Sequence, residues 1–401
     1  MSAQNAAAAA VPNARTAHTL RVGITFDAAT QKMTAALVRL AGRTFGRGSV
    51  LRCAGLALLA AATVASAQTK AASPLRLRIV GGLAGVNQYT RHEEPFWTQR
   101  LGALSGGRYT AEIVPFDRAG LRGAEVLSLV QVGAVPFGTS LLSQGAAKDV
   151  ELGAPDLAGL NPDIASLRRS VAAYRPHLQA TLRERHGIEL LAIYTYPAQV
   201  VFCNKAWAGL DGLKGRRVRT SSATQSDWVE ALGATPVVMP FAEVMPSLRA
   251  GHIDCVNTGT MSGNTIALDT LTTHLHPMAL TWGLSVFVAN RAAWEALPAD
   301  LQALLRQELP ALERRIWDEA ERETQDGIAC NIGDARCEAG RRGRMVLVGS
   351  TPQDEQRRRE LLAGTVLPRW LARCGPGCAE VWNRTLAPAT GVSAPLRPPV
   401  R

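Results

Sequence analysis

The segment from Leu213 to Asn264 constrains the fold more than any other part of the 401-residue chain. Short runs with alternating apolar residues in it predict strands at 217–219, 236–239 and 253–257. An amphipathic helix is expected between the first two strands, ending at Gly233, and a shorter helix over 242–250 precedes the third. This strand–helix–strand alternation is typical of a parallel α/β sheet.

Polar side chains stand where two of these strands end. Ligands of parallel α/β sheets bind beyond the carboxyl ends of the strands, and Arg219, Asn257 and Thr258 lie there. A guanidinium can hold a carboxylate through two parallel, charge-assisted hydrogen bonds, so Arg219 is the first candidate for a ligand contact. Arg216 and Arg217 are expected to be solvated or paired at the surface. The loop 258–263 is either part of the site or a plain strand-to-helix connection.

This segment resembles the periplasmic solute-binding receptors of tripartite ATP-independent periplasmic (TRAP) transporters, the DctP family. The matching pieces are Leu213-Lys214-Gly215 leading into Val218-Arg219-Thr220, the run LGATPVVMPFAEV at 232–244, and Ala250 to Cys255. Weaker similarity covers about Leu77 to Cys330. The resemblance implies a two-lobed α/β fold of the Venus-flytrap type, closing by a hinge around a small carboxylate. It also implies no enzymatic activity, no cofactor, and the membrane subunits of a TRAP permease as partners.

The order of elements in the resemblance divides the chain. The expected parts are 1–67 as N-terminal extension and signal peptide, 68–196 as lobe 1, 197–275 as lobe 2, 276–312 as a return to lobe 1 with the long helix, and 313–401 as the end of that helix with a Cys-containing segment on lobe 2. The long helix is expected over 294–328, and Pro310 should kink or split it. A further helix is expected at 353–372.

Three further positions are compared with the family pattern. Gln199 stands where relatives often hold a second ligand-contacting arginine, and an amide supplies no charge, so a less charged solute is expected. Alternatively, Gln199 is an ordinary polar strand residue. Asn257-Thr258 replaces a Glu-Asn pair, which shifts the amide by one position. Pro136-Phe137 stands where an Asp is common.

The first lobe offers candidates at the ends of its own strands. The glycine-rich stretch 81–88 leads to Asn87 and Gln88, and its backbone N–H groups are able to approach an anion. An ordinary tight βα turn explains the same glycines equally well. Thr139 ends another predicted strand. Trp282 either stacks on a ligand or fills the core, which is the commoner outcome for tryptophan.

Residues 1–67 are interpreted as a targeting segment. An acid-free basic region from Met33, the apolar run 54–64 and Ala65-Ser66-Ala67 together predict cleavage after Ala67 and a periplasmic location. Met33 is the expected true start. The apolar run is short for a membrane span, and Cys53 lacks a lipoprotein box, so no membrane anchor is expected.

Charge excludes one class of function. Residues 1–67 hold seven Lys/Arg and one Asp, so +6 of the net +11 leaves with them and +5 remains. A modest surplus suits an anionic ligand. No clustered basic stripe with interleaved aromatics is present, so nucleic-acid binding is not expected.

Six cysteines remain after cleavage, and an even number in an exported chain indicates disulfides. Cys330 with Cys337 and Cys374 with Cys378 are natural local pairs, which leaves Cys203 with Cys255. Fifteen pairings are formally possible for six cysteines. A zinc site from Cys374, Cys378, His274 and His276 has no recognised spacing, so no metal is expected.

A secreted enzyme is the alternative from another functional class. Cys203 or Cys255 would be its nucleophile, with His252 the nearest histidine in the sequence. None of the common hydrolase or phosphate-binding motifs occurs. Free thiols in the mature protein would favour this alternative, and full disulfide pairing would oppose it.

Overall fold

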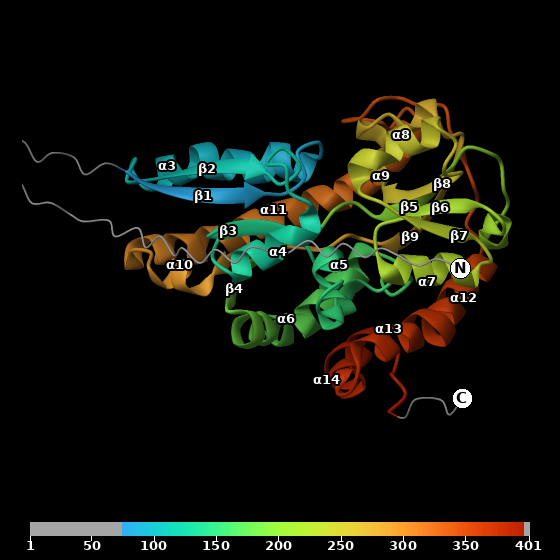
Figure 1. The fold of residues 1–401 in the computed structure, drawn as a ribbon. Helices are drawn as coiled ribbons and strands as arrows, with labels where there is room; N and C mark the ends of the chain where they lie inside the picture. Colours follow the sequence, from blue (N-terminus) through green and yellow to red (C-terminus); the bar gives the residue numbers. More distant parts are fainter. Residues whose placement is uncertain (1–73, 397–401) are drawn as a thin grey trace, which may run out of the picture. The chain divides into compact units, whose positions relative to one another are not determined.

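The computed structural model describes residues 74–396, which belong to one compact unit of the chain. Two sheets organise this part, and we call the regions around them lobe 1 and lobe 2 (Figure 1). The expected leader and its cleavage after Ala67 lie outside the described residues. Within 74–396, no helix combines the length and the apolar character that a membrane crossing requires.

The sheet of lobe 1 has the strand order β2–β1–β3–β10–β4. β1 runs parallel to β2 and β3, whereas β10 is antiparallel to β3 and β4. Its strands are β1 (Leu75–Gly81), β2 (Tyr109–Pro115), β3 (Phe137–Leu141), β4 (Ile188–Tyr194) and β10 (Ser285–Asn290). Its helical elements are η1 (Gln88–Glu93), η2 (Phe96–Arg100), α3 (Leu101–Leu104), α4 (Gly123–Gln131), α5 (Leu142–Gly145), η3 (Val150–Asp156), α6 (Ile164–His186) and α10 (Arg291–Glu295).

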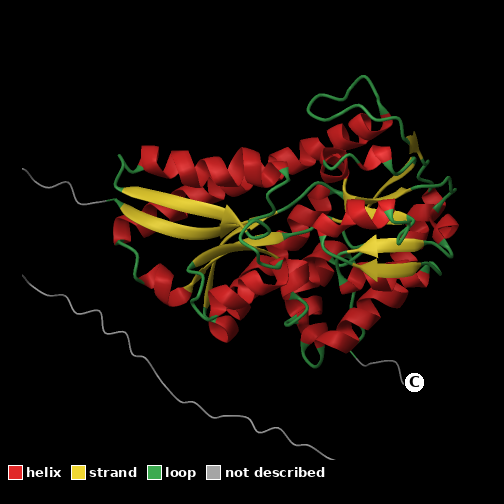
Figure 2. Cartoon of the chain, turned by 45° about the horizontal axis from the view of Figure 1, so that its top comes forward, coloured by secondary structure: helices red, strands yellow, loops and turns green. Residues whose placement is uncertain are grey.

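The sheet of lobe 2 has the order β11–β9–β5–β8–β6–β7. Figure 2 shows the strands of both sheets in yellow among the helices. Its strands are β5 (Gln199–Cys203), β6 (Arg217–Thr220), β7 (Thr235–Val238), β8 (Cys255–Gly259), β9 (His274–Thr281) and β11 (Val346–Leu347). Its helices are α7 (Ala223–Ala231), α8 (Val244–Arg249) and α9 (Thr260–Thr265). The alternation predicted for 213–264 is confirmed, with β6 parallel to both β7 and β8.

Three stretches of chain connect the lobes. Two are the short crossings 195–198 and 282–284, which touch where the Tyr196 N–H donates to the Trp282 carbonyl at 3.3 Å. The third is α11 (Ala299–Ile332), a 34-residue helix that contacts β4 in lobe 1 and α9 in lobe 2 (Figure 1).

Of the two outcomes expected at Pro310, a kink or a split, the split does not occur. α11 runs through Pro310, and the interruption lies earlier, at 296–298 between α10 and α11. The turns around Pro310 bury Leu305, Leu309 and Leu312 in the lobe 1 core. This packing offsets the backbone hydrogen bond that proline removes.

Gly327 lets α11 approach α9 closely. A Cβ at this position would lie only 2.4 Å from the Met261 backbone nitrogen. The close approach allows the Thr260 hydroxyl to donate to the Glu323 carbonyl at 3.0 Å and the Asn331 amide to donate to the Thr260 carbonyl at 2.9 Å. The second half of α11 is thereby fixed to lobe 2.

The last helices lie against both lobes. They are α12 (Pro352–Leu361), the π-helical turn η7 (Leu362–Val366), α13 (Leu367–Cys374) and α14 (Cys378–Thr390). The Trp370 indole donates to the Val150 carbonyl of lobe 1 at 3.1 Å, whereas Arg373 pairs with Asp227 on α7 of lobe 2. α14 packs on α6 of lobe 1. The segment expected on lobe 2 therefore reaches across to lobe 1.

All six cysteines of the described part form disulfides in the expected pairing, Cys203–Cys255, Cys330–Cys337 and Cys374–Cys378. The first joins register partners on β5 and β8 of lobe 2. The second closes the loop after α11, and the third connects α13 to α14.

Candidate functional site

Arg219 is a buried cation held in place by main-chain oxygens. It lies on β6, is 4% exposed, and donates from Nη1 to the Asn257 carbonyl at 2.8 Å. Nε and Nη2 both donate to the Met239 carbonyl, at 3.2 and 3.0 Å. A guanidinium has five N–H groups, so one remains on each terminal nitrogen. These two N–H groups are available to a ligand.

The charge of Arg219 has no anionic partner within residues 74–396. Burial alone lowers its pKa to about 10, which leaves it protonated at neutral pH. An isolated buried charge is costly, and an anion bound beside it would offset that cost. The neighbouring Arg217 is different, because it pairs with Asp254 at the surface, as expected.

Asn257 and Thr258 lie on β8, next to β6, and both are buried. Both polar atoms of the Asn257 side chain lack a hydrogen-bond partner within the described residues. The register pairs Arg219 with Val256, so side-chain alternation places Thr258 on the Arg219 face of the sheet and Asn257 on the other. The two neighbours therefore border different sides of the strand end.

Gln199 belongs to a hydrogen-bond network at the start of β5. Its Oε1 accepts from Gln225 Nε2 at 2.8 Å and from the Thr281 hydroxyl at 3.0 Å. Its Nε2 packs on Gly283, where a Cβ would lie 2.5 Å away and where φ is +73°. The amide NH₂ remains as a donor, whereas the carbonyl is already used inside the protein.

Lobe 1 contributes a buried acid beside the end of β1. Glu93 is fully buried and accepts from the Gly82 N–H at 2.9 Å and from the Thr139 hydroxyl. Burial raises the pKa of Glu93 to about 7, and the two hydrogen bonds oppose that shift. The absence of a side chain at Gly82 makes room, because a Cβ there would lie 2.9 Å from Glu93 Oε2.

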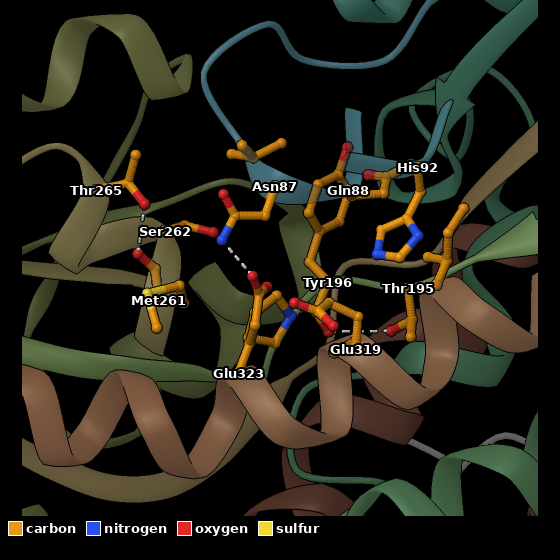
Figure 3. Close-up of a pocket in the computed structure, with 14 residues that line it drawn as sticks. Asn87, Gln88, His92, Thr195, Tyr196, Met261, Ser262, Thr265, Glu319 and Glu323 are labelled. Carbon is orange, nitrogen blue, oxygen red and sulfur yellow. Dashed lines mark hydrogen bonds between the residues drawn. The ribbon is translucent and has the colours of Figure 1, made fainter. Parts of the chain in front are cut away.

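A hollow lies where η1, α9, α11 and the first crossing meet (Figure 3). Gln88 lines it, is 5% exposed, and has no partner for either amide atom within residues 74–396. Asn87 also lines it, but its amide donates to Glu323 on α11 and so ties lobe 1 to the helix. Arg219 is not among the residues that line this hollow.

Trp282 lies in the core at the second crossing. It is 3% exposed, and its indole N–H donates to the Asn161 carbonyl at 3.0 Å. The Asp156 carboxylate accepts from the backbone N–H groups of Trp282 at 3.0 Å and Gly283 at 2.7 Å. A side chain of lobe 1 thus holds the main chain of the crossing.

The structure bears on two further expectations, the surface position of Arg216 and the cysteine nucleophile of the enzyme alternative. Arg216 is half-buried and not simply solvated, because it donates to the carbonyls of Gly212, Lys205 and Ala206 and its guanidinium lies 5.6 Å from the Trp207 ring. The expectation missed this because the acceptors are main-chain atoms that carry no sequence signal. Cys203 and Cys255 are bonded to each other, which removes both thiols from the cysteine-enzyme alternative.

Sequence reasoning did not single out Glu93 or Asp156. Glu93 stands next to Glu94 in the sequence, and only the turn geometry of η1 buries the first while leaving the second half-buried. Asp156 lies 126 residues from Trp282, to which it accepts. No local pattern indicates such a pairing.

Comparison with known proteins identifies relatives of this arrangement. The C4-dicarboxylate-binding periplasmic protein DctP of Rhodobacter capsulatus is 24% identical over 209 residues, covering 51% of this chain and 61% of its own length. The match thus spans less than two thirds of that relative.

Solved structures share the fold. DctP7 of Bordetella pertussis, an extracytoplasmic solute receptor binding pyroglutamic acid, superposes with a TM-score of 0.68 at 22% identity, covering 77% of this chain and 98% of that one. A TRAP periplasmic solute binding protein from Shewanella oneidensis with bound succinate gives 0.64 at 20% identity, with the same two coverages.

The family model for bacterial extracellular solute-binding protein, family 7 (DctP) matches residues 86–333. That range includes both crossings, Arg219 and all of α11. It comprises more than half of the chain, and the two-sheet fold agrees with it. The chain therefore belongs to the DctP family of bacterial extracellular solute-binding proteins, a family of binding proteins and not of enzymes.

Proposed function

We propose that the protein is a periplasmic receptor that binds a small carboxylate between its lobes and delivers it to the membrane subunits of a TRAP transporter. The observation that carries the proposal is Arg219, a buried cation without an anion of its own. Arg219, Gln199, Asn257 and Thr258 contribute from lobe 2, and Gln88 and Thr139 contribute from lobe 1.

The relatives support a carboxylate ligand. Dicarboxylates, pyroglutamic acid and succinate are the solutes named for the three proteins described above, and all carry a carboxylate. The remaining N–H groups of Arg219, one on each terminal nitrogen, suit the two oxygens of such a group.

Export is part of the proposal. A signal peptide that is translated from Met33 and cleaved after Ala67 would release the receptor into an oxidising compartment. Three disulfides in the described part agree with that location. N-terminal sequencing of periplasmic protein should begin at Gln68, and a mature N-terminus before Met33 would contradict this.

The main experiment identifies the ligand. Native mass spectrometry of receptor purified from its own periplasm would show a retained carboxylate. The protein is then stripped by unfolding and refolding and titrated calorimetrically with pyroglutamate, succinate and malonate. Failure of a folded, ligand-free receptor to retain or bind any carboxylate would refute the proposed function.

A further inference from the structure

We propose that Gln88 and Glu93 form a selecting wall in lobe 1, which favours a carboxylate that also bears an uncharged amide or lactam and disfavours a dicarboxylate. The inference rests on the proposed function, because it concerns the far end of the ligand that Arg219 would hold. It names the class of solute, which family membership leaves open.

Gln88 supplies the first part of the argument. Both its amide oxygen and its amide nitrogen are buried without a partner within the described residues, and the side chain lines the hollow (Figure 3). Leaving a buried polar group unpaired costs about 1–3 kcal/mol. A ligand amide offers one N–H and one C=O, so a single such group satisfies both atoms of Gln88.

Glu93 supplies the second part. Glu93 is not among the residues that line the hollow, but it lies close to Gln88, because a Cβ built on Gly82 would lie 2.9 Å from Glu93 Oε2 and 3.7 Å from Gln88 Nε2. No cation of the described part pairs with Glu93, whose contacts are the Gly82 N–H and the Thr139 hydroxyl. A second ligand carboxylate here would lie near a buried acid, and two neighbouring carboxyl groups disfavour each other's ionised form.

β8 and α9 link Arg219 to the hollow along the chain. Arg219 donates to the Asn257 carbonyl on β8, and β8 runs directly into α9. Met261 and Ser262 of α9 line the same hollow as Gln88. The inference places the second end of a solute held by Arg219 at Gln88.

The charge of the proposed cleft supports one carboxylate and not two. Among the residues assigned to it, Arg219 is the one permanent cation and Gln199 is neutral, and the hollow is also lined by the acids Glu319 and Glu323. A monocarboxylate balances Arg219, whereas a dicarboxylate leaves one negative charge unpaired at the acidic wall.

The test compares the affinities of two ligands of similar size for the complete mature receptor after its bound ligand has been removed. Pyroglutamate carries one carboxylate and a lactam, and succinate carries two carboxylates. The variants are Gln88→Met, which keeps the length of the side chain without the amide, and Glu93→Gln, which removes the acid. Thr90→Ala is the control, because Thr90 is exposed on the same turn and its hydroxyl has one hydrogen bond within the described residues, to the Val86 carbonyl.

Wild-type receptor should bind pyroglutamate at least about tenfold more tightly than succinate. Gln88→Met should weaken pyroglutamate binding by about tenfold while changing succinate binding by less than about threefold. Glu93→Gln should improve succinate binding and so reduce the preference for pyroglutamate over succinate. Thr90→Ala should leave this preference unchanged.

Two results would contradict the inference that Gln88 and Glu93 select the ligand. Wild-type receptor that binds succinate as tightly as pyroglutamate, with the binding lost in Arg219→Ala, would keep the proposed function and remove this inference. A preference for pyroglutamate that persists in folded Gln88→Met and Glu93→Gln would place the selection elsewhere. A wild type that binds no carboxylate removes both proposals together.

Discussion

The two walls of the proposed cleft carry charge in different ways. In lobe 2, main-chain carbonyls hold Arg219, and its pKa of about 10 keeps it charged over the physiological range. In lobe 1, Glu93 has a pKa near 7, so its charge changes with pH. We infer that attraction of a carboxylate by lobe 2 is constant, whereas the discrimination exerted by lobe 1 varies with pH.

The lobes also differ in covalent constraint. Cys203–Cys255 joins two neighbouring strands of the lobe 2 sheet. No cysteine occurs in the strands of the lobe 1 sheet, which depends on packing and hydrogen bonds alone. The fixed charge thus lies on the more constrained of the two sheets.

Removal of the fixed charge has the largest expected effect. Arg219→Ala should weaken binding of the preferred carboxylate by roughly thirtyfold or more, equivalent to about 2–5 kcal/mol, because it leaves a buried carboxylate unpaired. Arg219→Lys should restore only part of the lost affinity, since an ammonium lacks the two parallel N–H donors of the planar guanidinium. Calorimetric titration measures both, with circular dichroism to confirm folding.

Arg217→Ala is the matched control, because that arginine lies on the same strand but pairs with Asp254 at the surface. The affinity of the Arg217→Ala receptor for the preferred carboxylate should equal that of wild type. Unchanged affinity in folded Arg219→Ala would mean that lobe 2 does not supply the attraction.

Removal of the lobe 2 disulfide tests the difference in constraint. Replacing Cys203 and Cys255 together by alanine should lower the free energy of unfolding by about 2–4 kcal/mol, because the bond spans 52 residues. Replacing Cys374 and Cys378, which are 4 residues apart, should cost less. Urea denaturation followed by tryptophan fluorescence compares the two, and equal losses would contradict the loop-length argument.

Glu93→Gln tests the variable charge through pH. The folded pKa of Glu93, about 7, lies above its ordinary value of 4.5, so ionisation opposes folding. The stability associated with its neutral form is fully present below pH 4.5 and is lost as pH rises through 7. The stability of wild type relative to Glu93→Gln should therefore fall by on the order of 1–3 kcal/mol over this range.

The ionisable neighbours of Glu93 do not alter the expected difference in pH dependence between wild type and Glu93→Gln. Tyr89 and Tyr196 have raised pKa values, and that of Tyr194 is raised further, so all three stay neutral. Glu323 also has a pKa near 7, but it is present in both proteins and cancels. Glu94→Gln is the matched control, and parallel pH profiles for wild type and Glu93→Gln would show that the acid is not held neutral.

Arg216→Ala gives the smallest expected effect. Like Arg219, Arg216 donates to main-chain carbonyls, but it lies in a half-buried loop. Its loss should lower stability by about 0.5–1.5 kcal/mol and leave ligand affinity unchanged. Thermal unfolding and calorimetry separate the two effects, and a loss of affinity would show that burial is not what distinguishes the two arginines.

The sequence predicted the elements with short-range patterns. The order of β6, α7, β7, α8 and β8 follows from local periodicity and turn residues, which need no knowledge of the rest of the chain. The interruption at Leu297-Pro298 was missed because Pro310 gives an equally strong local signal, and only packing in the lobe 1 core decides between the two prolines.

The site was predictable only in part. Arg219 was found because a strand end and a family motif coincide there, and the structure shows it buried without an anion. The acid at Glu93 and the acceptors of Arg216 depend on main-chain contacts with residues far along the chain. Residue type carries no information about such contacts.

The helices α12, α13 and α14 determine how late in synthesis the protein is able to complete its folding. Trp370 and Trp382 belong to the same core cluster as Tyr174 of α6 and Val229 of α7. Ribosomes add about 5–20 residues per second from the N-terminus, so both lobes are synthesised before the helices that cover them. Until α14 is complete at Thr390, these apolar surfaces stay open to water. This core cluster is thus complete only after α14 has been synthesised, and a stop codon that removes α14 alone would leave it incomplete.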